Sequence, residues 1–533
     1  MSQELQGFTW IDISVLIVYM TAVLGIGIYF SKSRMSGKEF FKADGSVPWF
    51  VTSVSIFATI ISPLSFLSLA GKSYDGTWML WFAQLGTLIA VPLTIRLFLP
   101  VYARLNIDTA YHYLEIRFQS PALRVLGAVM FMIFQLGRMA IVMYLPCVAI
   151  GNMAGISVDL LILAMGVVSI VYSCTGGLKA VLWTDFMQGV ILLGGIALTL
   201  IYIVLKLDNG AADIADALFS QGRFLTARDQ LIDWNNLLGT SIVVTLIGGG
   251  LTTFCTYISS QDIVQRFTTT TSVRDLTRMT IGNGLLSITC ASLFFMIGTA
   301  LYLYYQQRPE AITEAFRNSQ DQVVVYFITK ELPVGITGII LAALYAAAQS
   351  SISTGINSIA TSWVMDVQSR ISPDMSAHRQ TRIARYISLA VGVAAVITAM
   401  YLARIDIKSA YELFKAFLGQ ALGALAGVFI LGALTRKTTA TGAFAAFITA
   451  TALILYCQFT IPSISFWTYS LIAIVTTLTV GTVVSRIQSM ITGRVYHAPE
   501  GSTMVKASRC SVAAGAEAAA AAAQDPAADV TAK

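Results

Sequence analysis

Apolar stretches long enough to cross a membrane recur along the whole sequence, and this recurrence limits the possible folds more than any other feature. A helix needs roughly 20 apolar residues to span the hydrocarbon of a bilayer, and about thirteen stretches approach that length. Of the 533 residues, 56% are hydrophobic and only 12% are charged, which leaves too little polar surface for a soluble multidomain protein. We therefore predict an all-α polytopic protein in a lipid bilayer.

The predicted spans are bounded by the ends of the apolar stretches. Because no basic segment or small-residue cleavage site accompanies the first stretch, we expect it to be a retained helix. An odd number of spans places the two termini on opposite sides of the membrane. The spans cover residues 10–30, 48–71, 78–101, 123–150, 158–174, 180–205, 237–259, 281–305, 334–364, 383–403, 411–434, 441–459 and 466–484.

Lysine and arginine are concentrated in alternate loops between these spans. Short basic loops stay in the cytoplasm, so we predict an outside N-terminus and a cytoplasmic C-terminus. The net charge of +6 then reflects topology, and we expect neither nucleic-acid binding nor an obligate protein partner. The basic residues are Lys32, Arg34, Lys38, Lys42, Arg104, Arg117, Lys179, Arg266, Arg274, Arg278, Arg370, Arg379, Arg382, Arg385, Arg436 and Lys437.

Helix-breaking residues interrupt the second and the seventh span. Pro63 removes a backbone hydrogen bond and clashes with the preceding turn, and Gly248 to Gly250 should weaken the seventh span near its middle. Paired interruptions in corresponding halves are typical of transporters built from inverted repeats, with the binding site at the breaks. The alternative is chance, because proline and glycine are frequent in membrane helices.

This spacing predicts two inverted repeats of five helices, preceded and followed by peripheral helices. The predicted boundaries are an extra helix and loop at 1–47, a first repeat at 48–205, a second repeat at 206–434, two peripheral helices at 435–498, and an Ala-rich tail at 499–533 that we expect to be disordered.

A cluster of hydroxyl groups lies in the ninth span, where a bilayer would otherwise favour hydrocarbon. At 100° per residue, Ala347, Ser350, Ser351 and Thr354 share one helix stripe, with Ser353 beside it. Several neutral oxygens converging on one point suit a hard monovalent cation. The alternative is that each hydroxyl bonds to a carbonyl of its own helix. If a cation binds, the carbonyls before the break at Pro63 should face this stripe.

Asp185 lies just inside the sixth span, where an unpaired carboxylate would be costly. It could simply complement the helix dipole in a first turn. With Ser350, Ser353 and Thr354 as partners, however, it would form a second sodium site, because a carboxylate and hydroxyls follow the hard-oxygen preference of calcium and magnesium.

Arg138 lies near the centre of the fourth span, where a guanidinium costs at least about 2.5–3.5 kcal/mol. Apart from Asp185, the apolar spans contain no deeply placed acidic residue, so we expect an anionic substrate to be its partner. The alternative is a structural arginine bonded to carbonyls or water. Gln84, Ser62 and Ser65 could complete a polar pocket, although each is also a common helix-packing residue.

Four ordered motifs together resemble the sodium:solute symporter family, and in particular its bacterial sialic acid branch. The resemblance runs from Phe8 to about Val484 and implies a LeuT-like fold of thirteen helices in a bacterial inner membrane. It implies Na⁺ as the coupling ion and no enzymatic activity. The motifs are Phe57-Ala58-Thr59-Ile60-Ile61-Ser62, Trp183-Thr184-Asp185, Ser260-Gln261-Asp262-Ile263-Val264-Gln265-Arg266 and Gln349-Ser350-Ser351-Ile352-Ser353-Thr354-Gly355-Ile356-Asn357-Ser358.

The resemblance also assigns site residues. It places the substrate carboxylate on Arg138. The chain departs from the family pattern at Ile60, where a threonine is expected, and at Pro63, which replaces a serine. Losing a hydrogen-bonding group from a buried polar site costs about 1–3 kcal/mol, which weakens the case for sialic acid itself. The implied sets are Ala58, Ile61, Ala347, Ser350 and Ser351 for a first Na⁺; Asp185, Ser350, Ser353 and Thr354 for a second; and Ile60, Ser62, Ser65, Gln84 and Arg138 for substrate.

The sequence thus predicts a Na⁺-coupled symporter that imports a carboxylate-bearing sugar, such as sialic acid or a related sugar acid, by alternating access. The alternative is the same transporter acting on a neutral sugar or a small amino or carboxylic acid, with Arg138 in a structural role. A channel, a receptor or a membrane enzyme is disfavoured, because we find neither a signalling domain nor an intramembrane nucleophile with its base.

Overall fold

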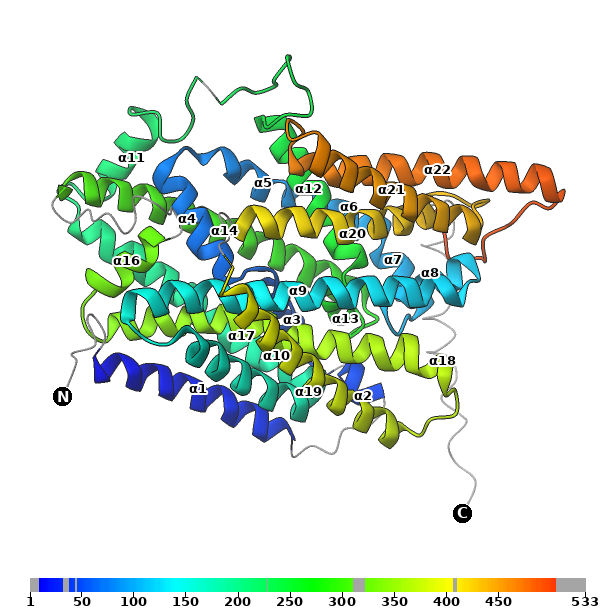
Figure 1. Ribbon diagram of the computed structural model, residues 1–533, viewed down its shortest axis with the longest axis horizontal. Helices are drawn as coiled ribbons and strands as arrows, with labels where there is room; N and C mark the ends of the chain where they lie inside the picture. Colours follow the sequence, from blue (N-terminus) through cyan, green and yellow to red (C-terminus); the bar gives the residue numbers. More distant parts are fainter. Residues whose placement is uncertain are drawn as a thin grey trace.

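The computed structural model describes residues 9–31, 38–43, 46–227, 229–309, 322–405 and 410–504. Every regular element in these residues is a helix, and most long helices run along the long axis of the molecule (Figure 1). Ten of the described helices are long and apolar enough to cross a membrane, one further pair is bent by 62°, and two shorter helices are also apolar. Each predicted span overlaps one of these segments, which confirms the all-helical membrane fold.

The first half of the chain forms six predicted spans. Gly177, with a φ of 59°, marks the turn between the fifth and sixth spans inside α10. The elements are α1 (Trp10–Ser31), α2 (Lys38–Lys42), α3 (Trp49–Ile60), α4 (Pro63–Asp75), η1 (Trp78–Leu80), α5 (Trp81–Leu85), α6 (Thr87–Leu97), α7 (Leu99–Leu105), α8 (Ala110–Phe118), α9 (Pro121–Ala154), α10 (Val158–Lys206) and α11 (Ala211–Phe219).

The second half forms the other spans. The elements are α12 (Ile242–Ser259), α13 (Gln261–Phe267), α14 (Val273–Gln306), α16 (Gln322–Lys330), α17 (Ile336–Ser362), the π-helical segment η3 (Trp363–Gln368), α18 (Ser369–Ile371), α19 (Ala377–Leu402), α20 (Ala410–Leu434), α21 (Ala440–Thr460), η4 (Phe466–Thr468) and α22 (Tyr469–Thr492).

The second span breaks at the predicted place. Ile61 and Ser62 adopt extended conformations between α3 and α4, and Pro63 is the first residue of α4. Proline is well suited to that position, because the first N–H of a helix has no intrahelical acceptor to lose. The prediction from Pro63 is therefore confirmed.

The predicted break at the three glycines of the seventh span is wrong. Helix α12 continues through Gly248, Gly249 and Gly250, and the chain leaves the helix only at Ser260, which has a ψ of 117°. The glycines instead permit close contact, since a Cβ at Gly249 would lie 2.4 Å from the carbonyl oxygen of Ala83. Of the two predicted breaks, the one in the second span is therefore confirmed and the one in the seventh is not, because α12 continues to the end of its span and the chain leaves the helix only after it, at Ser260.

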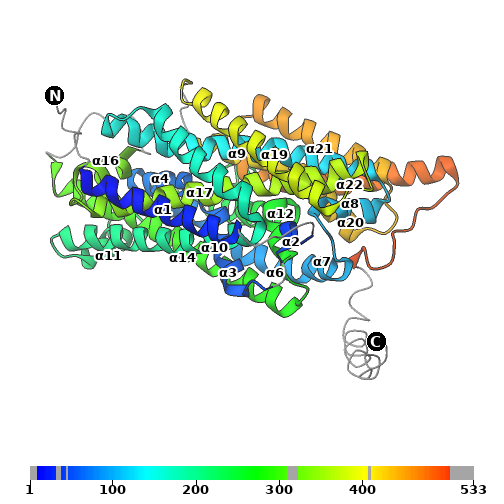
Figure 2. The same cartoon turned by 90° about the horizontal axis from the view of Figure 1, so that it is seen from below.

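Helix α17 is the central element of the fold. It is buried along almost its whole length and packs against α10, α9 and α3. Helix α1 lies along one edge of the molecule, whereas α21 and α22 lie along the opposite edge, as Figures 1 and 2 show together. The hydroxyl cluster of α17 is therefore placed inside the protein, away from the lipid-facing edges.

The described chain begins and ends at opposite ends of the molecule. Asp12, at the start of α1, accepts hydrogen bonds from the backbone N–H groups of Gly335 and Gly338. Near the other end of the chain, Tyr496 donates to the carbonyl of Arg117 on α8. In Figure 1, α2, α8 and α18 gather at one end and α11 and α16 at the other.

Two of the arginines assigned to loops are in fact buried. Arg117 donates to the carbonyls of Gly432 and Thr435, and Arg266 is 1% exposed on α13. Lys32 and Arg34 lie outside the described residues, as does the predicted tail except for residues 499–504. Within those six residues, the carbonyl of Ser502 accepts a hydrogen bond from Tyr113 of α8.

Candidate functional site

The end of α3 and the hydroxyl stripe of α17 meet in the interior. Ser350 Oγ lies 2.8 Å from the carbonyl oxygen of Ala58 on α3 and 3.0 Å from that of Ala347 on its own helix. Ser351 Oγ lies 3.3 Å from the carbonyl oxygens of Thr59 and Ala347. The hydroxyls thus bond across the two helices as well as within α17, and four of the five residues predicted for a first sodium site converge.

Ile61, the fifth member of that set, lies directly after α3. Its backbone N–H bonds to the carbonyl of Phe57 at 2.9 Å, and no hydrogen bond joins it to α17 in the part of the chain that the structure describes. The last carbonyls of a helix have no intrahelical partner, so those of Ala58 and Thr59 at the end of α3 can accept hydrogen bonds from Ser350 and Ser351.

Asp185 is fully buried on α10, and its two carboxylate oxygens have different surroundings. Its Oδ2 atom accepts hydrogen bonds from Ser55 at 2.7 Å and from Thr354 at 3.3 Å. Its Oδ1 atom has no hydrogen-bond partner among the described residues. Ser353 donates instead to the carbonyl of Ser350 at 3.2 Å, so only Thr354 of the predicted partners bonds directly to Asp185.

The cation beside Asp185 is Arg266. Its Nη2 atom lies 2.7 Å from Asp185 Oδ2 and 2.6 Å from Thr354 Oγ1, and its Nε atom lies 2.8 Å from Ser55 Oγ. Arg266 follows an apolar span in the sequence, as the predicted loop charges do, and no local pattern indicates this pairing.

Arg138 also has a protein partner, contrary to the reasoning that an anionic substrate must supply one. Its Nη1 atom lies 2.7 Å from Asp262 Oδ2, and its Nη2 atom donates to the carbonyl of Thr59. Asp262 follows the predicted end of the seventh span, so its position in the sequence indicates a loop, whereas α13 places it in the core. The Nε–H of Arg138 is buried and has no acceptor among the described residues.

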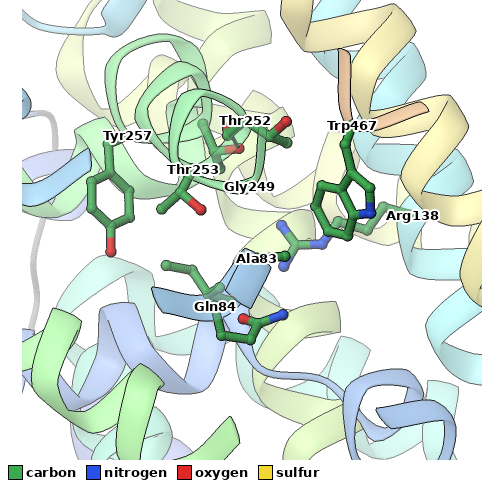
Figure 3. Close-up of a pocket in the computed structure, with 10 residues that line it drawn as sticks. Ala83, Gln84, Arg138, Gly249, Thr252, Thr253, Tyr257 and Trp467 are labelled. Carbon is green, nitrogen blue, oxygen red and sulfur yellow. Dashed lines mark hydrogen bonds between the residues drawn. The ribbon is translucent and has the colours of Figure 1, made fainter. Parts of the chain in front are cut away.

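A cavity of about 70 Å³ lies beside Arg138. Figure 3 shows the guanidinium pointing into the space between Trp467, Gln84 and the side chains of α12. The cavity combines amide and hydroxyl groups with aromatic faces, which suits a small polar solute. It is lined by Ile60, Ala83, Gln84, Arg138, Gly249, Thr252, Thr253, Thr256, Tyr257 and Trp467.

Three of the five predicted substrate residues line this cavity, namely Ile60, Gln84 and Arg138. Ser62 and Ser65 lie near the break between α3 and α4 but are not among its lining residues. The threonines of α12 are absent from the predicted set, although the spacing of Thr252 and Thr256 by one helical turn is a signal for them. Trp467 is also absent from that set, because η4 brings it in from outside the predicted repeats.

A polytopic helical protein with a broken span packed against a hydroxyl-bearing helix, and with a cavity beside the end of the broken helix, has an architecture typical of secondary transporters. Residues 40–450 match the model of the sodium:solute symporter family, and the chain belongs to this family. It is therefore a multi-pass membrane protein that couples solute symport to Na⁺, and it is not an enzyme.

Relatives that match nearly the whole chain include transporters of sialic acid and of glucose. The sodium/sialic acid symporter SiaT of Proteus mirabilis is 32% identical, with 90% of this chain and 96% of the relative covered. NanT of Aliivibrio fischeri, also a sodium/sialic acid symporter, is 30% identical over 90% and 93% of the two chains. The sodium/glucose cotransporter of Vibrio parahaemolyticus is 27% identical over 90% and 91%.

Solved structures agree with the fold. A Na⁺-coupled sialic acid symporter in a substrate-bound, outward-open state superposes with a TM-score of 0.84 at 30% identity, covering 92% of this chain and all of the other. The nucleobase-cation-symport-1 transporter Mhp1 superposes with a TM-score of 0.54 at 14% identity, covering 84% and 94%. The second likeness shows the fold alone, and both agree with the predicted LeuT-like architecture.

Proposed function

We propose that this symporter imports a carboxylate-bearing sugar, such as sialic acid or a related sugar acid, by alternating access. The observation that carries the proposal is Arg138, which lines the cavity with a buried N–H that has no described acceptor. A carboxylate is the natural acceptor for a guanidinium, and Gln84 with the threonines of α12 suits the hydroxyl groups of a sugar. The relatives named as sialic acid symporters support the same substrate class.

Two sodium ions drive the proposed transport. The first is held by Ala58, Ile61, Ala347, Ser350 and Ser351, and the second by Asp185, Ser350, Ser353 and Thr354. An ion at the first site joins α3 to α17 and so raises the population of the state that binds substrate. Two cations moving with one monoanion carry net positive charge inward, and each unit of charge gains roughly 2.3 kcal/mol per 100 mV.

A neutral sugar is the second candidate substrate. Its support is the ion pair between Arg138 and Asp262, which already compensates the guanidinium charge, and the similarity to a sodium/glucose cotransporter. In this alternative Arg138 fixes the shape of the cavity and does not bind an anion.

We also propose that the transporter lies in a bacterial plasma membrane with its N-terminus outside and its C-terminus in the cytoplasm. The helices α2 and α18, which carry Lys42 and Arg370, lie at one end of the molecule, whereas α11 at the other end carries Asp213 and Asp216 and no basic residue. This asymmetry supports the orientation because positive loops stay in the cytoplasm.

Uptake into proteoliposomes tests the proposal. A thermal-shift screen of sugar acids, neutral sugars and amino acids, run in Na⁺ and then in K⁺, first selects the solute that stabilises the purified protein. We expect a radiolabelled sugar acid to accumulate in an inward Na⁺ gradient and faster at an inside-negative potential. Equal uptake in Na⁺ and K⁺ gradients would contradict the sodium coupling, and accumulation of neutral sugars alone would favour the second candidate.

A further inference from the structure

The short helix α13 carries one member of each of two buried ion pairs. Its seven residues are all buried, and Asp262 and Arg266 lie one turn apart on it. Asp262 binds Arg138 at the substrate cavity, and Arg266 binds Asp185 at the proposed second sodium site. A single short helix therefore contacts both sites at the same time.

Arg266 contacts the same oxygen atoms that a sodium ion would need at Asp185. Its guanidinium lies within 2.7 Å of Asp185 Oδ2 and within 2.6 Å of Thr354 Oγ1, and both residues belong to the proposed second ion set. The Oδ1 atom of Asp185 stays buried without a partner among the described residues. A cation that used both carboxylate oxygens would satisfy this atom and would have to compete with Arg266.

Asp262 occupies the guanidinium of Arg138, which a substrate carboxylate would need. Its Oδ2 atom lies 2.7 Å from Arg138 Nη1, so it supplies the carboxylate that a sugar acid would otherwise bring. Helix α13 thus carries an internal counterpart of each proposed cargo, a cation for Asp185 and a carboxylate for Arg138.

We propose that Arg266 is a tethered competitor of sodium at Asp185. Sodium binding there displaces Arg266, releases α13 and so breaks the ion pair between Asp262 and Arg138. The inference rests on the proposed second sodium site and explains how occupation of that site prepares the substrate cavity. Sodium can bind only in the fraction of molecules in which Arg266 has left the site. The apparent dissociation constant of sodium is therefore raised by the inverse of that fraction.

Sodium titration of the purified full-length protein tests the competition. Thermal stabilisation by Na⁺ is measured without substrate, at constant ionic strength in K⁺, in a Ser351→Ala background that disables the first site. Removing the competitor with Arg266→Gln should lower the half-saturating Na⁺ concentration at least about fivefold, a typical coupling factor. Arg266→Lys keeps the positive charge, so its half-saturating Na⁺ concentration should stay near that of the Ser351→Ala protein.

Arg274→Gln is the matched control, because it removes an exposed arginine at the start of α14. An Arg266→Gln protein that is folded but has an unchanged or higher half-saturating concentration would overturn the competition. The proposed symport would stand after such a result, provided that Na⁺ still stabilises the protein that has no substitution at Arg266. If the wild type shows no stabilisation by Na⁺ at all, the sodium sites fail together with this inference.

Hydrogen exchange in the wild type tests the release of α13 independently of any variant. We expect the backbone amides of residues 261–267 to exchange about fivefold faster in Na⁺ than in K⁺, in line with the same coupling factor. The amides of α17 should become more protected. Slower or unchanged exchange of α13 in Na⁺ would contradict the proposal, even if Arg266→Gln does not fold.

Discussion

Replacing Ser350 and Ser351 together by alanine is expected to abolish Na⁺-driven uptake. Both hydroxyls lie within 3.3 Å of carbonyl oxygens on α3 and α17, and both are proposed sodium ligands. Losing each polar group costs about 1–3 kcal/mol, so a total of about 2 kcal/mol or more weakens Na⁺ binding by roughly 30-fold or more. The measurement is the Na⁺ dependence of uptake in proteoliposomes, together with Na⁺-dependent thermal stabilisation.

Ser358→Ala is the matched control on the same helix. Ser358 is equally buried, but its hydroxyl donates to the carbonyl of Gly355 at 3.1 Å within α17. We expect this variant to keep the wild-type Na⁺ dependence. A Ser350→Ala, Ser351→Ala protein with wild-type half-saturation by Na⁺ would contradict the placement of the first sodium site.

Arg138→Met is expected both to abolish sugar-acid uptake and to destabilise the protein strongly. The substitution leaves the fully buried Asp262 without its charge partner, and removing one member of a buried ion pair typically costs about 3–5 kcal/mol. Stability is measured as the free energy of unfolding in detergent, and uptake is measured in a Na⁺ gradient.

The double variant Arg138→Met, Asp262→Asn separates the two effects. It removes both charges, so most of the lost stability should return, because replacing a complete buried pair is often nearly neutral. Uptake of the sugar acid should stay lost, since the guanidinium is still absent. Uptake that survives in Arg138→Met would instead assign Arg138 a structural role and favour the neutral-sugar alternative.

The sequence predicts the helical membrane fold and the first helix break because those depend on local properties. Span length follows from apolar composition, and a proline such as Pro63 acts on its own backbone. The predicted break in the seventh span is wrong for a tertiary reason. Gly248 to Gly250 are close-packed against neighbouring backbone and so remain helical, whereas the chain breaks at Ser260, where no glycine or proline marks the change.

The candidate site could be predicted only where its residues occur in one local pattern. The serines and threonine of α17 share a helix stripe, and they do face the end of α3. The partners Asp262 and Arg266 follow the apolar span and therefore resembled loop residues, although α13 folds back into the core. Trp467 reaches the cavity from the last helical hairpin, a contact that linear spacing cannot indicate.

A high-resolution structure determined separately in Na⁺ and in K⁺ would most directly test whether oxygen atoms of α3 and α17 bind sodium together. We predict an ion peak in Na⁺ between the carbonyls of Ala58 and Ala347 and the hydroxyl of Ser351, and its loss in K⁺. A substrate-bound structure in Na⁺ without such a peak, in which the hydrogen bond from Ser350 to Ala58 persists, would contradict the account.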